Sequence, residues 1–115
     1  MPLVSILMPV RDDLRTLSDC LESIQKQSHK DWELVVVDDG SSDGSGEFLQ
    51  ETAAKDSRIR VLRERPRGIV AALNSGLAAC AGSYVARMDA DDRMRPERLE
   101  IQFAFLQRET QVDFC

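Results

Sequence analysis

Two aspartates separated by a single alanine, Asp89 and Asp91, form the part of the sequence best suited to metal chemistry. Alternate side chains of an extended segment project to the same side, so the two carboxylates would face one way. At about 5 Å apart and an effective dielectric constant near 20 they would repel by roughly 3 kcal/mol. A bound Mg²⁺ or Mn²⁺ removes that repulsion, because hard divalent cations prefer carboxylate oxygens and readily share a phosphate oxygen. The alternative is that these acids cap the helix that follows.

A second pair, Asp38 and Asp39, directly follows the three valines 35–37. A carboxylate in this place can accept hydrogen bonds from a ribose hydroxyl or from the N–H of a nucleobase, and Gly40 lets the backbone come close to a ligand. The local sequence is equally typical of a turn, in which Asp38, Asp39 and Asp43 would shape the loop and cap the next helix.

The elements that must position these acids follow from the apolar pattern. Short apolar runs predict strands, and Leu14, Leu17, Leu21 and Ile24 recur at the three- and four-residue spacing of one helix face, which Asp12 or Asp13 is placed to cap. Such alternation with short connections predicts an α/β fold, a mostly parallel sheet with helices on both faces. The expected strands are 3–8, 32–37, 59–62, 83–88 and 112–115, and the expected helices are 14–24, 47–54, 69–79 and 96–109.

The acidic residues gather where this fold would bind a ligand. Right-handed crossovers bring the carboxyl ends of parallel strands to one edge of the sheet, and ligands bind in the crevice there. Segments 9–13, 38–43, 63–68 and 89–92 would all arrive at that edge. Three of them contain eight of the twenty acidic residues of the chain, namely Asp12, Asp13, Asp38, Asp39, Asp43, Asp89, Asp91 and Asp92.

These residues together resemble the nucleotide-binding half of the family 2 glycosyltransferases, which are inverting enzymes of the GT-A fold. Five short motifs occur in the order and spacing of that family, over essentially the whole chain. The resemblance implies a Rossmann-like GT-A sheet, truncated here, in which residues 1–115 are the nucleotide-sugar-binding portion and the acceptor-binding half is absent. The motifs are residues 4–10, residues 21–24 with Gln27 and Ser28, residues 32–43, Gly68 with Ala72, Asn74 and Gly76, and residues 81–92.

The resemblance also implies an activity and roles for individual residues. The activity is metal-dependent, inverting transfer of a sugar from a nucleotide-diphosphate sugar, commonly a UDP-sugar, to an acceptor hydroxyl of a saccharide, a lipid or another compound. Asp91 would ligate Mn²⁺ or Mg²⁺ through the diphosphate, with Asp89 toward the ribose and the metal, and Asp39 would bind the base edge. The residues expected to bind the nucleotide are Pro9, Val10, Arg11, Asp38, Asp39, Arg67 and Asp89.

The sequence departs from the family in two respects. Arg11 and Asp12 stand where an aromatic residue and Asn are usual, although an arginine can lay its guanidinium plane on a base. The catalytic base of the family is expected beyond Cys115, so we expect this piece to bind the donor without full catalysis. Metal-dependent transfer by the 115 residues alone would contradict that expectation. The alternative function is a non-catalytic nucleotide-binding or assembly module of the same fold.

Composition excludes several other classes. The apolar fraction is 43%, the charged fraction is 30% and the net charge is −5, which argues against non-specific nucleic-acid binding. No apolar run reaches the length of a membrane span, and residues 1–10 do not read as a secretory signal. No Gly-x-Gly-x-x-Gly follows the first strand, which disfavours a dinucleotide-dependent oxidoreductase.

Cellular location and self-association follow from cysteine usage and from the last predicted helix. Three widely spaced cysteines without a Cys-x-x-Cys pair are typical of reduced thiols. We therefore expect a cytoplasmic protein, peripheral to the membrane if a longer chain carries it there. If a missing half normally covers Phe103, Phe105 and Leu106, their exposure here would drive self-association.

Overall fold

The computed structural model describes residues 3–28, 30–82 and 84–91. Some of the predictions concern residues outside these ranges. They are Asp92, the expected helix 96–109 with its apolar residues, and the expected strand 112–115. The described elements are β1 (Val4–Val10), α1 (Leu14–Gln25), β2 (Trp32–Asp39), α2 (Ser45–Lys55), β3 (Ile59–Glu64), α3 (Ile69–Ala79) and β4 (Tyr84–Arg87).

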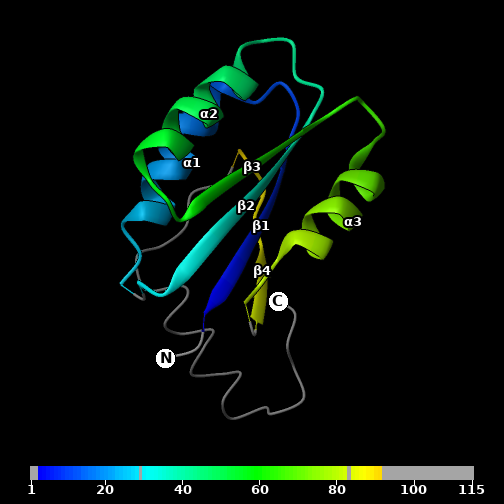
Figure 1. The fold of residues 1–115 in the computed structure, drawn as a ribbon. Helices are drawn as coiled ribbons and strands as arrows, with labels where there is room; N and C mark the ends of the chain where they lie inside the picture. The colour runs from blue at the N-terminus through cyan, green and yellow to red at the C-terminus, as the bar shows by residue number, and fades with distance from the viewer. Residues whose placement is uncertain (1–2, 29, 83, 92–115) are drawn as a thin grey trace.

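The described strands form one parallel sheet in the order β3-β2-β1-β4. Helices α1 and α2 cover one face and α3 covers the other (Figure 1). This is the α/β architecture that the alternating apolar pattern predicts, with a helix between successive parallel strands. None of the helices within the described ranges is both long and apolar enough to cross a membrane.

The register of β1 with its neighbours aligns the strand ends. Val10 pairs with Asp38 of β2, and Leu7 pairs with Arg87 of β4. One residue beyond β4, the Met88 N–H donates to the Leu7 carbonyl at 3.0 Å. The segments that follow β1, β2 and β4 therefore leave the sheet at the same edge.

The main core lies between the sheet and the helices α1 and α2. Residues of β1 alternate between the two faces of the sheet, as those of any strand do. Ile6 and Met8 pack on the α1–α2 side, where the Cys20 Sγ lies 3.5 Å from the Met8 Sδ. Cys20 is buried and Cys80 is half-buried. The larger buried side chains of this core include Leu17, Leu21, Ile24, Trp32, Leu34, Val36 and Leu49.

Glu33 stabilises the sheet at the amino ends of the strands, opposite the edge just described. Its carboxylate accepts the Ser5 Oγ–H at 2.5 Å and the Ala81 N–H at 2.6 Å, and the Ser5 Oγ accepts the Gly82 N–H at 2.8 Å. Burial raises the pKa of Glu33, but the hydrogen bonds from Ser5 and Ala81 and the nearby charge of Arg60 outweigh it and hold this pKa below its usual range. This network ties the segment entering β4 to β1 and β2, and so helps to place the residues that follow β4.

On its other face the sheet contacts α3 very closely, because α3 is rich in small residues. A Cβ placed on Gly76 would overlap the Leu7 Cδ1 and would lie only 2.9 Å from the Val37 Cγ2. Glycine at this position therefore allows the helix backbone to rest directly on β1 and β2.

Replacing Gly76 with alanine tests this close approach. Alanine favours a helix over glycine by about 1 kcal/mol, but the added methyl group must displace packed side chains, and overpacking of a core costs about 1–3 kcal/mol. The two effects together should lower the free energy of unfolding of Gly76→Ala by up to about 2 kcal/mol, measured by urea denaturation. The control is Asn74→Ala on the exposed side of α3, which should leave stability unchanged or slightly raised. Equal effects of the two substitutions would contradict the contact.

Candidate functional site

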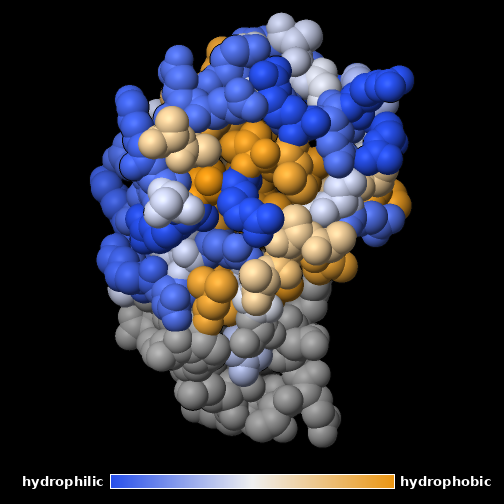
Figure 2. All heavy atoms as spheres, in the orientation of Figure 1, coloured by the Kyte–Doolittle hydropathy of each residue, from blue (hydrophilic) through white to orange (hydrophobic). Residues whose placement is uncertain are grey.

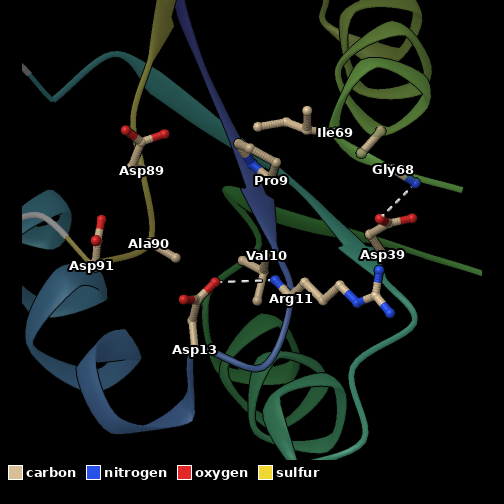
Figure 3. Close-up of a pocket in the computed structure, with 11 residues that line it drawn as sticks. Pro9, Val10, Arg11, Asp13, Asp39, Gly68, Ile69, Asp89, Ala90 and Asp91 are labelled. Atoms are coloured by element: carbon tan, nitrogen blue, oxygen red, sulfur yellow. Dashed lines mark hydrogen bonds between the residues drawn. The ribbon is translucent and has the colours of Figure 1, made fainter. Parts of the chain in front are cut away.

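A cavity of about 350 Å³ lies at the carboxyl ends of the strands, between the end of β1 and the start of α3 (Figure 3). In the view of Figure 2, hydrophobic surface is visible between the α1–α2 side and the α3 side, with hydrophilic surface above it. The residues that line the cavity are Pro9, Val10, Arg11, Asp13, Asp39, Gly68, Ile69, Ala72, Asp89, Ala90 and Asp91.

Asp89 and Asp91 flank a buried alanine at one end of the cavity. Ala90 is only 3% exposed and belongs to the core, and its carbonyl accepts the Thr16 Oγ1–H at 2.9 Å. Figure 3 shows the Ala90 methyl group directed toward Val10. Ala90 and Asp91 lie in a turn beyond β4, not in the extended segment that the sequence predicted, yet both aspartates are exposed. The Asp89 side chain is 55% exposed although its Oδ1 accepts an Arg87 N–H at 3.2 Å. The small central residue thus turns both carboxylates outward at the cavity.

The chemistry of this pair fits a divalent cation that is shared with a second molecule. Within the described ranges, no cluster of three or more His, Cys, Asp or Glu side chains could hold a metal ion by itself. Mg²⁺ is commonly held by one or two carboxylates, with the remaining oxygens from water and from substrate phosphates. Asp89 and Asp91 supply that number of carboxylates and leave room for a phosphate-bearing ligand.

Asp39 lies at the other end of the cavity and holds the start of α3. Its Oδ1 accepts the Arg67 N–H at 2.9 Å and its Oδ2 accepts the Gly68 N–H at 3.0 Å (Figure 3). Gly68 has φ +94°, a conformation that glycine adopts without strain as the chain enters α3. Each carboxylate oxygen keeps a further lone pair for a ligand. Asp39 therefore fixes the segment that leads into α3, instead of capping the next helix along the chain as the alternative prediction has it, and it also faces the cavity.

The structure does not bring two of the predicted nucleotide-binding side chains to the cavity. Asp38 is 1% exposed and lies against α2, where it accepts the Ser41 N–H at 3.1 Å and pairs with Arg63 at 3.6 Å. Successive residues of a strand point to opposite faces, so Asp38 and Asp39 cannot face the same ligand. The Arg67 guanidinium pairs instead with Glu64 at 2.7 Å and with the Ser75 Oγ at 3.1 Å.

Two loops that border the cavity are joined through Asp43. Its Oδ2 accepts the Leu14 N–H at 3.0 Å, and its Oδ1 accepts the Ser45 Oγ–H at 2.6 Å and the Ser45 N–H at 3.0 Å. The hydrogen bond from the Ser45 hydroxyl is the main cause that holds the pKa of Asp43 below its usual range. Asp13 occupies the position before α1 without capping it, because its Oδ2 accepts the Arg11 N–H at 3.0 Å.

Five of the lining residues are not among those predicted to bind the nucleotide or the metal. Asp13 is among the acids expected at this edge of the sheet, but the sequence predicts only a capping role for it. Gly68, Ala72 and Ala90 lie in motifs on which the family resemblance rests, whereas nothing in the sequence points to Ile69, which is exposed at the start of α3. The five residues are Asp13, Gly68, Ile69, Ala72 and Ala90.

Comparison with known sequences identifies one family. Residues 5–115 match the family described as "Glycosyl transferase family 2". The chain is 41% identical over 109 residues to the putative glycosyltransferase EpsE of Bacillus subtilis, covering 93% of this chain and 39% of that protein. It is 38% identical over 106 residues to the putative teichuronic acid biosynthesis glycosyltransferase TuaG of the same organism, covering 91% and 42%. The chain thus spans about two fifths of the length of these relatives.

Comparison with solved structures gives the same fold. Residues 1–349 of Staphylococcus aureus TarS in complex with UDP superpose with a TM-score of 0.82 at 26% identity, covering 91% of this chain and 32% of that one. The mannosyltransferase PcManGT of Pyrobaculum calidifontis, in complex with GDP-Man and Mn²⁺, superposes with a TM-score of 0.78 at 28% identity, covering 90% and 31%. The predicted GT-A fold and the family resemblance are confirmed.

The loop connection through Asp43 predicts a specific pH dependence. A carboxylate whose folded pKa lies below its unfolded pKa stabilises the protein above the unfolded value, and this contribution is lost as the pH falls through the folded pKa. We expect Asp43→Asn to lower the free energy of unfolding at pH 7, with the difference from the unmodified protein shrinking as the pH falls below the usual range of aspartate. Urea denaturation from pH 7 to pH 3 measures it. Asp19→Asn, on the exposed face of α1, is the control. A difference that does not change with pH would contradict this account.

Proposed function

The chain belongs to glycosyl transferase family 2, and on this basis we propose that it is the nucleotide-sugar-binding portion of a glycosyltransferase. The single observation that carries the proposal is that Asp39 and the Asp89–Asp91 pair line one cavity at the carboxyl ends of the strands. TarS and PcManGT, which share the fold, were solved with UDP and with GDP-Man and Mn²⁺. A nucleotide-diphosphate sugar, with a UDP-sugar as first candidate, fits a cavity that offers a base-edge acceptor at one end and carboxylates for a cation at the other.

The lining residues would divide the donor between them. Pro9 and Val10, at the end of β1, would line the nucleoside, and the fixed Asp39 carboxylate would accept an N–H of the base. Asp91 would hold Mn²⁺ or Mg²⁺ together with the diphosphate, and Asp89 would lie toward the ribose and the metal. The separation of these groups along one cavity would orient the donor so that its sugar extends beyond the diphosphate.

The proposed reaction is transfer of the sugar to an acceptor hydroxyl with inversion at the anomeric carbon. The bound cation would neutralise the negative charge that grows on the departing diphosphate. Attack from the side opposite that leaving group inverts the configuration and requires a general base to take the proton of the hydroxyl. We assign the base and the acceptor site to parts of a longer protein, because the relatives extend well past the length matched here.

Removal of one carboxylate tests the cation assignment. We expect calorimetry to show UDP or GDP binding that is strengthened by Mn²⁺, and Asp91→Asn to weaken the Mn²⁺-dependent binding at least about tenfold, since loss of groups that support a metal typically weakens binding by this much or more. Asp91 is exposed, so circular dichroism of the variant should match that of the unmodified protein. Asp19→Asn removes an exposed carboxylate far along α1 and serves as the control.

Two results would count against the assignment. If Asp91→Asn leaves the Mn²⁺ dependence unchanged, Asp91 is not the ligand. If the unmodified protein binds neither nucleotide with Mn²⁺, the proposed function itself is wrong for these residues.

A further inference from the structure

Among the described residues that line the cavity, Arg11 supplies the only positively charged side chain. Its backbone N–H donates to Asp13, but its guanidinium forms no hydrogen bond or ion pair with any residue in the described part of the chain. In Figure 3 the side chain extends from the end of β1 toward the Asp39 end of the cavity. The other arginines near this edge are engaged elsewhere, Arg63 with Asp38 and Glu47 and Arg67 with Glu64.

Arg11 and Asp39 have opposite hydrogen-bonding character. A guanidinium only donates and an ionised carboxylate only accepts. The two backbone N–H groups that bind Asp39 fix both of its oxygens, and the residue is only 5% exposed, so the carboxylate cannot turn away from the cavity. Arg11 is exposed and long enough to adjust its position. At its Asp39 end the cavity therefore offers a fixed acceptor beside an adjustable donor.

We propose that Arg11 and Asp39 together select the nucleobase of the donor. The inference rests on the proposed function and adds a specificity-determining residue to it. Uracil presents a ring N–H beside a carbonyl, and so does guanine, so that Asp39 accepts from the N–H while Arg11 donates to the carbonyl. Cytosine and adenine present a ring nitrogen lone pair beside an amino group. In the same position each would set a lone pair against the carboxylate and a donor against the guanidinium.

The surroundings of Asp39 strengthen the discrimination between nucleobases. Pro9, Ile69 and Ala72 belong to the cavity wall that Asp39 shares, and they offer no competing hydrogen bonds from their side chains. Asp39 is only 5% exposed, and a poorly hydrated polar group without a hydrogen-bond partner is costly, so a base that sets a lone pair against this carboxylate binds more weakly. The Asp39 end of the cavity, with a buried acceptor beside a donor, therefore discriminates between base edges.

Nucleotide affinities of the unmodified protein and of Arg11→Gln test the proposal. We expect UDP and GDP to bind about 10–100 times more tightly than CDP and ADP in the presence of Mn²⁺, the range typical of discrimination by a good pair of hydrogen bonds. Arg11→Gln should reduce this ratio about tenfold, because it removes a charged donor. Its affinity for inorganic pyrophosphate with Mn²⁺ should stay unchanged. Arg65→Gln is the matched control, since Arg65 is exposed and lies outside the cavity.

Three results would contradict either the role of Arg11 or the proposed function. If the ratio is the same in Arg11→Gln, Arg11 does not read the base, while nucleotide binding and the proposed function stand. If Arg11→Gln weakens all four nucleotides and pyrophosphate equally, Arg11 serves the diphosphate instead and the inference fails. If the unmodified protein binds none of the nucleotides, the proposed function fails and the inference fails with it.

Discussion

The parallel pairing of β1 with β2 on one side and with β4 on the other is the constraint on which the whole site depends. It ends three strands at one edge, so that Pro9, Asp39 and Asp89 meet although they are far apart in the sequence. A register shift of one residue would reverse which side chains face which helices. The core prevents such a shift, because Ile6 and Met8 must face α1 and α2 while Leu7 must fit beneath Gly76.

The two adjacent aspartates at the end of β2 show how completely the sheet determines their chemistry. Asp39 faces α3, where it fixes the start of the helix and lines the cavity. Asp38 faces α2, where it is buried against Arg63. The residue type and the strand are the same, yet one carboxylate is available to a ligand and the other stabilises the scaffold. Their side of the sheet, rather than their charge, separates these roles.

The order of elements and the edge that carries the site could be predicted from the sequence, because apolar periodicity and strand-end positions are local properties. The side of the sheet that each helix covers is not local, so the sequence could not tell which of Asp38 and Asp39 faces the cavity. The direction of the Arg67 side chain could not be predicted either, because it depends on the turn that leads into α3. There the guanidinium binds Glu64 and Ser75. Asp13 does not cap α1, since Asp43 from another loop binds the Leu14 N–H.

The central claim is that one cavity binds a nucleoside diphosphate and a divalent cation together. Anomalous diffraction from crystals grown with Mn²⁺ and UDP tests it most directly. The account predicts a manganese peak between the diphosphate and the carboxylates of Asp89 and Asp91, with the uracil N–H at Asp39. A nucleotide bound elsewhere, or a manganese peak remote from both aspartates, would contradict it.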